Sequence, residues 1–168
     1  MRKGRNQTKH VELSNMVKKN VTVYVDADAC PVKEEISETC KLYSVDIFFI
    51  ASYAHVTNQS DEHWVYVDSE KESADLYIVN HARTGDVVIT QDHGLASLLT
   101  DRGIQVLSPR GVKFSESEMN HTLFKRYLSA KQRRAGNRVK GPGKMTSSDR
   151  IRFREALERI LSINEGKH

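Results

Sequence analysis

The sequence contains few cysteines and no long run of apolar residues. Only Cys30 and Cys40 occur among its 168 residues, too few for the disulfide framework of a small secreted domain. No apolar stretch approaches the roughly 20 residues that a membrane-spanning helix needs. The basic N-terminus also lacks the apolar core of a secretory signal. We therefore expect free thiols in a cytoplasmic protein that has no membrane partner.

Charge is distributed unevenly along the chain. Residues 1–19 carry a net charge of +5, residues 20–124 carry −10 and residues 125–168 carry +9. We expect residues 1–20 to be a disordered basic extension and residues 21–168 to form a single domain that ends in a basic C-terminal arm, residues 125–168. An acidic body suits cation binding, and a basic arm suits a polyanion.

Short apolar stretches alternate with helical patterns. Strands are expected over residues 21–26, 45–51, 63–68, 86–92 and 104–108. Helices are expected over residues 31–43, 73–85, 94–103, 115–136 and 148–162, the last with Ile151, Ala156, Leu157, Ile160 and Leu161 facing a core. This alternation predicts an α/β fold with a central, mostly parallel five-stranded sheet flanked by helices, followed by the basic helical arm.

Acidic residues follow the predicted strands at one edge of the sheet. Asp26 and Asp28 follow the first strand, Asp92 follows the fourth, and Asp75 lies near the start of the helix between the third and fourth. Ligand sites in such sheets lie beyond the carboxyl ends of the strands. We therefore expect these carboxylates to meet in one cleft and to bind Mg²⁺ or Mn²⁺, which prefer oxygen ligands and can promote phosphodiester cleavage.

Several residues also have a purely structural interpretation. A single Asp at a strand end is often a turn or cap residue, and Asp28 is the best candidate to cap the helix that begins near Pro31. Asp86 lies at the opposite edge of the sheet, where we expect a turn. Cys30 is expected to pack rather than to react, and Trp64 is expected to lie in the core.

The C-terminal arm carries the residues expected to bind nucleic acid. They are Arg133, Arg134, Arg138, Lys140 and Lys144. Such a segment can neutralise phosphates independently of sequence. Tyr127 and Phe153 are the nearest aromatic residues, so stacking of single-stranded bases is only weakly indicated. A homo-oligomer is left open.

Four motifs together resemble the YaiI/YqxD family of uncharacterised bacterial proteins. They are "VDADACPV" at residues 25–32, "SADLYIV" at 73–79, "GDVVITQDHGLA" at 85–96 and the tail "RRAGNRVKGPG…DRIRF", within a resemblance that spans roughly residues 21–162. That family is similar to the PIN-like nuclease superfamily. The resemblance implies a PIN-like three-layer fold and acidic residues that bind Mg²⁺ or Mn²⁺ to cleave nucleic acid, commonly RNA.

The resemblance also implies roles for individual residues. Asp26, Asp75 and Asp92 match the catalytic and metal-binding acids of the PIN-like pattern. Asp28 is a fourth candidate metal ligand. The further acid that such sites use on a helix could be Glu34, Glu35 or Glu38, or Asp28 could replace it.

The sequence leads to three hypotheses of function. The first is a divalent-metal-dependent nuclease that hydrolyses phosphodiester bonds of nucleic acid, with RNA favoured. The second is a HAD-type phosphatase, because "VYVDADA" resembles the D-x-D motif of that superfamily, with Asp26 as nucleophile and Asp28 as general acid. The third is a non-catalytic RNA-binding protein that uses its basic arm.

Overall fold

The computed structural model describes residues 20–28, 30–53, 63–70, 72–115 and 143–165. Its elements in chain order are β1 (Thr22–Asp26), α2 (Lys33–Leu42), β2 (Asp46–Ser52), β3 (Trp64–Val67), α3 (Ser73–His81), β4 (Val87–Ile89), α4 (His93–Thr100), β5 (Gln105–Leu107) and α6 (Ser147–Glu165). Each of these elements has the type that the sequence predicted for its segment. The helix predicted over residues 115–136 and the basic extension lie almost entirely outside the described residues.

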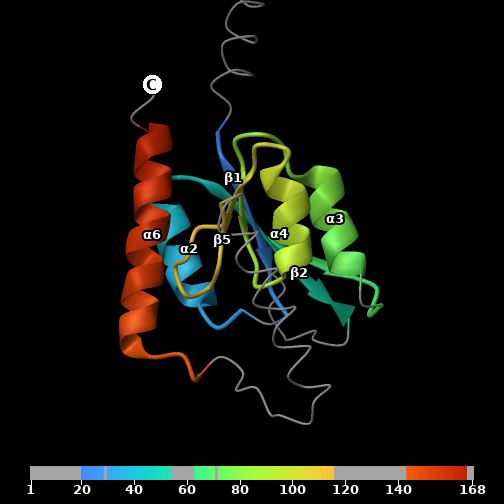
Figure 1. Cartoon of the computed structure of the whole chain (residues 1–168), viewed down its shortest axis with the longest axis horizontal. Helices are drawn as coiled ribbons and strands as arrows, with labels where there is room; N and C mark the ends of the chain where they lie inside the picture. Colours follow the sequence, from blue (N-terminus) through green and yellow to red (C-terminus); the bar gives the residue numbers. More distant parts are fainter. Residues whose placement is uncertain (1–19, 29, 54–62, 71, 116–142, 166–168) are drawn as a thin grey trace, which may run out of the picture.

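The strands form one parallel sheet in the order β3-β2-β1-β4-β5. In Figure 1, α2 and α6 cover one face of this sheet, and α3 and α4 cover the other. The described structure thus has three layers. It confirms the predicted α/β class and five-stranded sheet, and it is consistent with the three-layer arrangement that the PIN-like resemblance implied.

The central strand β1 is buried on both faces. Val23 and Val25 point into the core beneath α2 and α6, whereas Tyr24 points into the core beneath α3 and α4. A strand that is covered on both sides has no solvent-facing positions, which explains the uninterrupted run of Val23, Tyr24 and Val25.

The last helix, α6, packs on the core with a face that partly differs from the prediction. Four of the five residues expected to face inward do so at least partly: Ala156, Leu157, Ile160 and Leu161. Ile151 is 60% exposed, and the fully buried Phe153 takes the inward position instead. The apolar spacing of i, i+4, i+7 and i+8 begins at Phe153 and leaves Ile151 on the opposite side of the helix.

Both cysteines are buried free thiols, as the sequence predicted. Burial raises the pKa of the Cys30 thiol to about 11 and that of Cys40 to about 12. Because the thiolate is the reactive form, Cys30 acts as a packing residue although it lies close to the start of α2.

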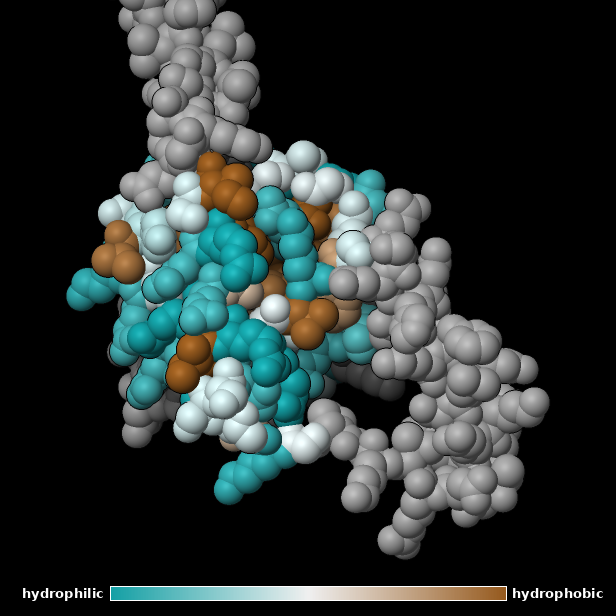
Figure 2. Space-filling view, turned by 60° about the vertical axis from the view of Figure 1, so that its left-hand side comes forward, coloured by the Kyte–Doolittle hydropathy of each residue, from teal (hydrophilic) through white to brown (hydrophobic). Residues whose placement is uncertain are grey.

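The surface turned toward the reader in Figure 2 is mainly hydrophilic, with separate apolar side chains. Leu42 and Ile151 are two of the large apolar side chains that are exposed on the described part of the molecule. No helix among the described residues is long and apolar enough to cross a bilayer.

Candidate functional site

The strand order creates a switch point between β1 and β4. The chain leaves β1 toward α2 on one face and leaves β4 toward α4 on the other. In open α/β sheets, ligands tend to bind beyond the carboxyl ends of two such strands. Val25 pairs with Ile89 in the sheet register, so the next residues along, Asp26 and Thr90, are neighbours at this carboxyl edge.

Thr90 joins Asp26 to Asp92. Its buried hydroxyl donates to Oδ2 of Asp26 at 3.1 Å and accepts the backbone N–H of Asp92 at 3.0 Å. Asp92 is the N-cap of α4, because its Oδ1 accepts the N–H of Leu95 at 3.0 Å. Gly94 leaves space beside this carboxylate, since a Cβ there would lie 3.2 Å from Oδ1. Thr90 was missed by the sequence reasoning, which had only its position two residues before Asp92 as a signal.

Asp75 completes the group from the first turn of α3. Burial and the negative charges of Asp92 and Asp26 raise the pKa of the Asp75 carboxyl to about 6, with a smaller effect from Glu72. Burial also raises the pKa of Asp26, as do the charges of Asp28 and Asp92, while the Thr90 hydrogen bond opposes the shift. Carboxylates from three separate segments therefore repel one another at this edge, a repulsion that a bound cation would relieve.

The donor set fits a hard divalent cation. Within the described ranges, no three His, Cys, Asp or Glu side chains stand close enough to form a ready-made ligand cluster. Mg²⁺ characteristically binds one or two carboxylates directly and keeps several waters. Oxygen donors, the space beside Asp92 and the mutual repulsion of the carboxylates all suit that kind of binding.

Asp28 is held differently from the other three acids. The backbone N–H of Ser52, at the end of β2, donates to its two carboxylate oxygens at 3.1 and 3.2 Å. The N-cap of α2 is Val32, without a side-chain cap. The prediction that Asp28 caps this helix is therefore wrong, because α2 begins only at Lys33, beyond the reach of Asp28. Asp28 remains a candidate metal ligand, because its negative charge acts on Asp26.

Other acids have structural partners. Asp86 is buried and accepts the N–H groups of Thr22 at 3.1 Å and Arg83 at 2.9 Å, as expected of a turn residue. Two of the α2 glutamates considered as the further acid of the site pair with arginines of α6. Glu35 binds Arg150 at 3.1 Å, and Glu38 binds Arg154. These pairs join α2 to α6.

One of the five predicted nucleic-acid-binding residues, Lys144, lies in the described part of the chain, and it is exposed. The other four, Arg133, Arg134, Arg138 and Lys140, lie outside it. Arg110, in the loop that follows the carboxyl end of β5, donates to Asp149 at 2.9 Å and to the carbonyl oxygen of Gly143. This contact ties the chain beside Lys144 to the same edge of the sheet as the carboxylates.

Comparison with known proteins identifies the family. The model of the family described as "Uncharacterized BCR, YaiI/YqxD family" matches residues 24–163. The chain belongs to this family. The family assignment confirms the resemblance found in the sequence motifs.

YaiI/YqxD relatives are similar along most of their length. A UPF0178 protein of Bacillus velezensis is 51% identical over 156 residues, which cover 92% of this chain and 93% of the relative. A UPF0178 protein of Bacillus cytotoxicus is 49% identical over 144 residues, 86% of this chain and 95% of the relative. One of Listeria innocua is 44% identical over 136 residues, 80% and 93% respectively. No solved structure gave a significant match.

Proposed function

We propose that this YaiI/YqxD protein is a nuclease that uses Mg²⁺ or Mn²⁺ to hydrolyse phosphodiester bonds of nucleic acid, with RNA as the favoured substrate. The observation that carries the proposal is that one side chain, Thr90, contacts both Asp26 and Asp92 at the switch-point edge, where the charges of these two residues also act on Asp75. A divalent cation bound there would supply a Lewis acid and lower the pKa of a bound water.

The repulsion itself favours a functional explanation. Crowded carboxylates with raised pKa values destabilise a metal-free fold at neutral pH, because the unfolded chain ionises them more easily. Thr90 nevertheless holds Asp26 and the backbone of Asp92 together at this edge. A structural role alone would be better served by neutral side chains, whereas cation binding requires the charges.

The basic residue at the same edge supports a polyanionic substrate. Three carboxylates alone would repel nucleic acid, and a bound cation offsets only part of their charge. Lys144 adds a positive charge where the chain enters α6, and the sequence before it contains Arg133, Arg134, Arg138 and Lys140. Such contacts to phosphates would hold a long backbone, rather than a small phosphomonoester, across the carboxylates.

The phosphatase alternative has less support. It requires Asp28 as a general acid that donates a proton to a leaving group. The backbone N–H of Ser52 instead donates to both oxygens of this side chain, so Asp28 already serves as an acceptor toward β2.

Removing the metal is the first test of the proposal. Purified protein with Mn²⁺ is expected to cleave labelled RNA, and DNA more slowly. EDTA should abolish cleavage, and excess Mn²⁺ should restore it. Asp101→Asn is the matched control, because Asp101 is an exposed carboxylate at the far end of α4, and this variant should cleave like the wild type. Salt-sensitive binding without cleavage would support the RNA-binding alternative, and hydrolysis of small phosphomonoesters would support the phosphatase.

The raised pKa of Asp75 predicts a pH-dependent stability of the metal-free protein. Below about pH 3 the carboxyl is protonated in both folded and unfolded chains, so it has no effect. As the pH rises from there through about 6, the unfolded chain ionises first and the free energy of unfolding falls. A shift of this size corresponds to about 3 kcal/mol, which solvent screening of the partly exposed side chain reduces to about 1–2 kcal/mol.

Asp75→Asn should therefore be more stable than the wild type at pH 7.5 in EDTA and equally stable at pH 3. Urea denaturation at the two pH values measures the difference. Equal stabilities at both pH values would show that burial and the charges of Asp92 and Asp26 do not raise the pKa of Asp75.

A further inference from the structure

Four aromatic rings form a continuous ladder at the β2–β3 edge of the sheet. Phe49 stacks on Trp64 with ring centroids 4.9 Å apart, Trp64 on Tyr66 at 6.1 Å, and Tyr66 on Tyr53 at 6.2 Å. All three interplanar angles lie between 20° and 23°. We call these four residues the aromatic ladder. Its rings come from two neighbouring strands and the residue that follows β2.

The aromatic ladder is covered only in part. Phe49 is buried at its inner end, Trp64 and Tyr66 are half-buried, and Tyr53 is 60% exposed at its outer end. The sequence interpretation of Trp64 as a core residue therefore accounts for only one side of this ring. A further aromatic group can stack on the free face of a ring at the end of such a series. Tyr53, at the exposed end, presents such a face to solvent.

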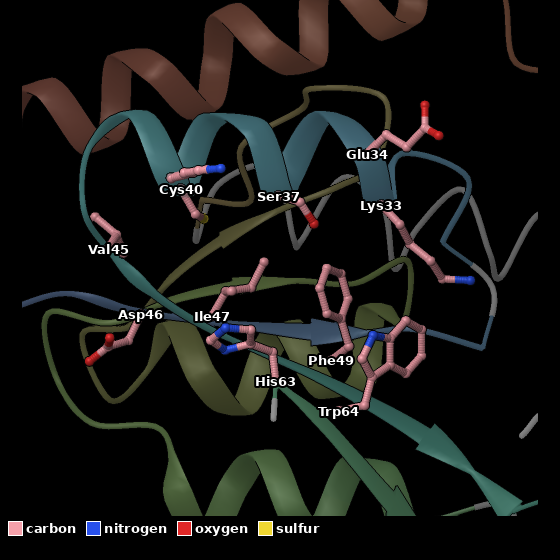
Figure 3. Close-up of a pocket in the computed structure, with 11 residues that line it drawn as sticks. Lys33, Glu34, Ser37, Cys40, Val45, Asp46, Ile47, Phe49, His63 and Trp64 are labelled. Carbon is pink, nitrogen blue, oxygen red and sulfur yellow. The ribbon is translucent and has the colours of Figure 1, made fainter. Parts of the chain in front are cut away.

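A groove under α2 is lined by the two inner rings of the aromatic ladder and continues toward the start of β2. Its volume is about 910 Å³, and its lining includes Trp64, Phe49 and Lys33, which makes it roomy enough for a ligand of nucleotide size. Figure 3 shows Phe49 and Trp64 rising side by side from the sheet toward α2, while Lys33 extends from the start of the helix. The Lys33 ammonium lies 5.8 Å from the centre of the Trp64 ring. The other charged side chains that line the groove are Lys41, Glu34 and Asp46.

The exposed end of the aromatic ladder lies at the same carboxyl edge of the sheet as the candidate metal centre. Tyr53 directly follows Ser52, whose N–H donates to Asp28, and β2 pairs with β1 in a register that sets Ile50 opposite Asp26. A flat group stacked on Tyr53 would therefore lie at the carboxyl edge, where the phosphate attached to it could reach the carboxylate-bound cation.

We propose that the aromatic ladder and its groove bind unstacked bases of a single-stranded nucleic acid, with Tyr53 stacking on the base nearest the carboxylates. This inference rests on the proposed function, since it names the form of substrate for the same site. Aromatic rings accept any base, because every base has a π-face, and a neighbouring lysine attracts the phosphates. Bases inside a duplex are already stacked on one another and cannot join the ladder.

Binding is measured in EDTA, so that the result does not depend on metal chemistry. Fluorescence anisotropy of labelled oligo(U) and oligo(dT) gives the affinity. Trp64, which is the single tryptophan of the chain, reports on the ladder through its intrinsic fluorescence. Both single strands should bind and change this fluorescence, whereas a duplex of the same length should bind more weakly and leave it unchanged.

The decisive variant is Tyr53→Ala, which should weaken single-strand binding by about fivefold or more. Tyr53→Phe keeps the ring and should bind like the wild type. Leu42→Ala is the matched control, because it removes an apolar side chain that is 70% exposed and lies at the opposite end of α2 from Lys33. Circular dichroism melting shows whether each variant is folded.

The two proposals fail in different ways. Unchanged affinity in Tyr53→Ala, unchanged Trp64 fluorescence on binding, or no binding of any single strand would overturn the stacking proposal. If Mn²⁺-dependent cleavage persists in that case, the nuclease proposal stands although the stacking proposal has failed. Conversely, Tyr53-dependent binding with no cleavage under any metal condition would refute the nuclease and leave the base-stacking surface intact.

Discussion

Asp26→Asn is expected to lower Mn²⁺-dependent cleavage of RNA by about 100-fold or more. Asp26 ends the central strand, and the Thr90 hydroxyl donates a hydrogen bond to it. The negative charges of Asp28 and Asp92 also act on it. Asparagine keeps the shape but removes the negative charge that would hold the cation. Electrophilic stabilisation by a metal is worth several kcal/mol, and each 1.4 kcal/mol lost from the transition state is about tenfold in rate.

The same substitution should not weaken the fold, which separates loss of chemistry from unfolding. Burial and nearby charges raise the pKa of Asp26, so the neutral amide relieves a repulsion that the metal-free protein experiences at neutral pH. Thermal melting in EDTA at pH 7.5 should give a Tm equal to or above that of the wild type. Full cleavage activity in Asp26→Asn would contradict the assignment of this residue to the metal centre.

Phe153→Ala is expected to reduce the free energy of unfolding by about 3–5 kcal/mol. The ring is fully buried in the core beneath α2 and α6. Its surroundings cannot easily close the resulting cavity, because the loop at Gly111 already packs against the helix backbone. A Cβ at Gly111 would lie 2.9 Å from the backbone of Arg152 and Phe153, and its φ of +85° suits glycine.

Ile151→Ala provides the matched comparison on the same helix. This side chain is 60% exposed, so its truncation should change stability by less than about 0.5 kcal/mol. Urea denaturation of both variants tests which face of α6 packs on the core. A larger loss for Ile151→Ala than for Phe153→Ala would show that the helix packs with the face that the sequence alone suggested.

The order of strands and helices could be predicted because it depends on local patterns. The β-branched and aromatic run before Asp26 indicates a buried strand by itself, and so does the run before Asp92. Their carboxyl ends share an edge in any parallel sheet, which is why the acids could be grouped before their positions were known.

The partners within the site could not be predicted, because they depend on register between distant segments. Thr90 bonds to Asp26 only because β4 pairs beside β1 with Val25 opposite Ile89. Asp28 faces Ser52 for a similar reason, since β2 flanks β1 on its other side. Periodicity within one segment carries no information about either contact.

The buried face of α6 was available from the sequence, because Phe153 continues the helical spacing of Leu157, Ile160 and Leu161 whereas Ile151 does not. The stacking of rings from separate strands, in contrast, was beyond the sequence. Phe49 and Trp64 stack because β2 and β3 pair in that register. From the sequence, Phe49 and Trp64 are apolar residues of two separate strands, and nothing indicates that their rings form one surface.

Calorimetric titration of the metal-free protein with Mn²⁺ at pH 7.5 tests the central claim most directly. We expect saturable binding by the wild type and by Asp101→Asn, and binding weakened at least about tenfold in Asp26→Asn and Asp92→Asn, since carboxylates supply the ligands. Equal affinity in all four proteins, or no binding by the folded wild type, would contradict a metal centre at the carboxyl edge of β1 and β4.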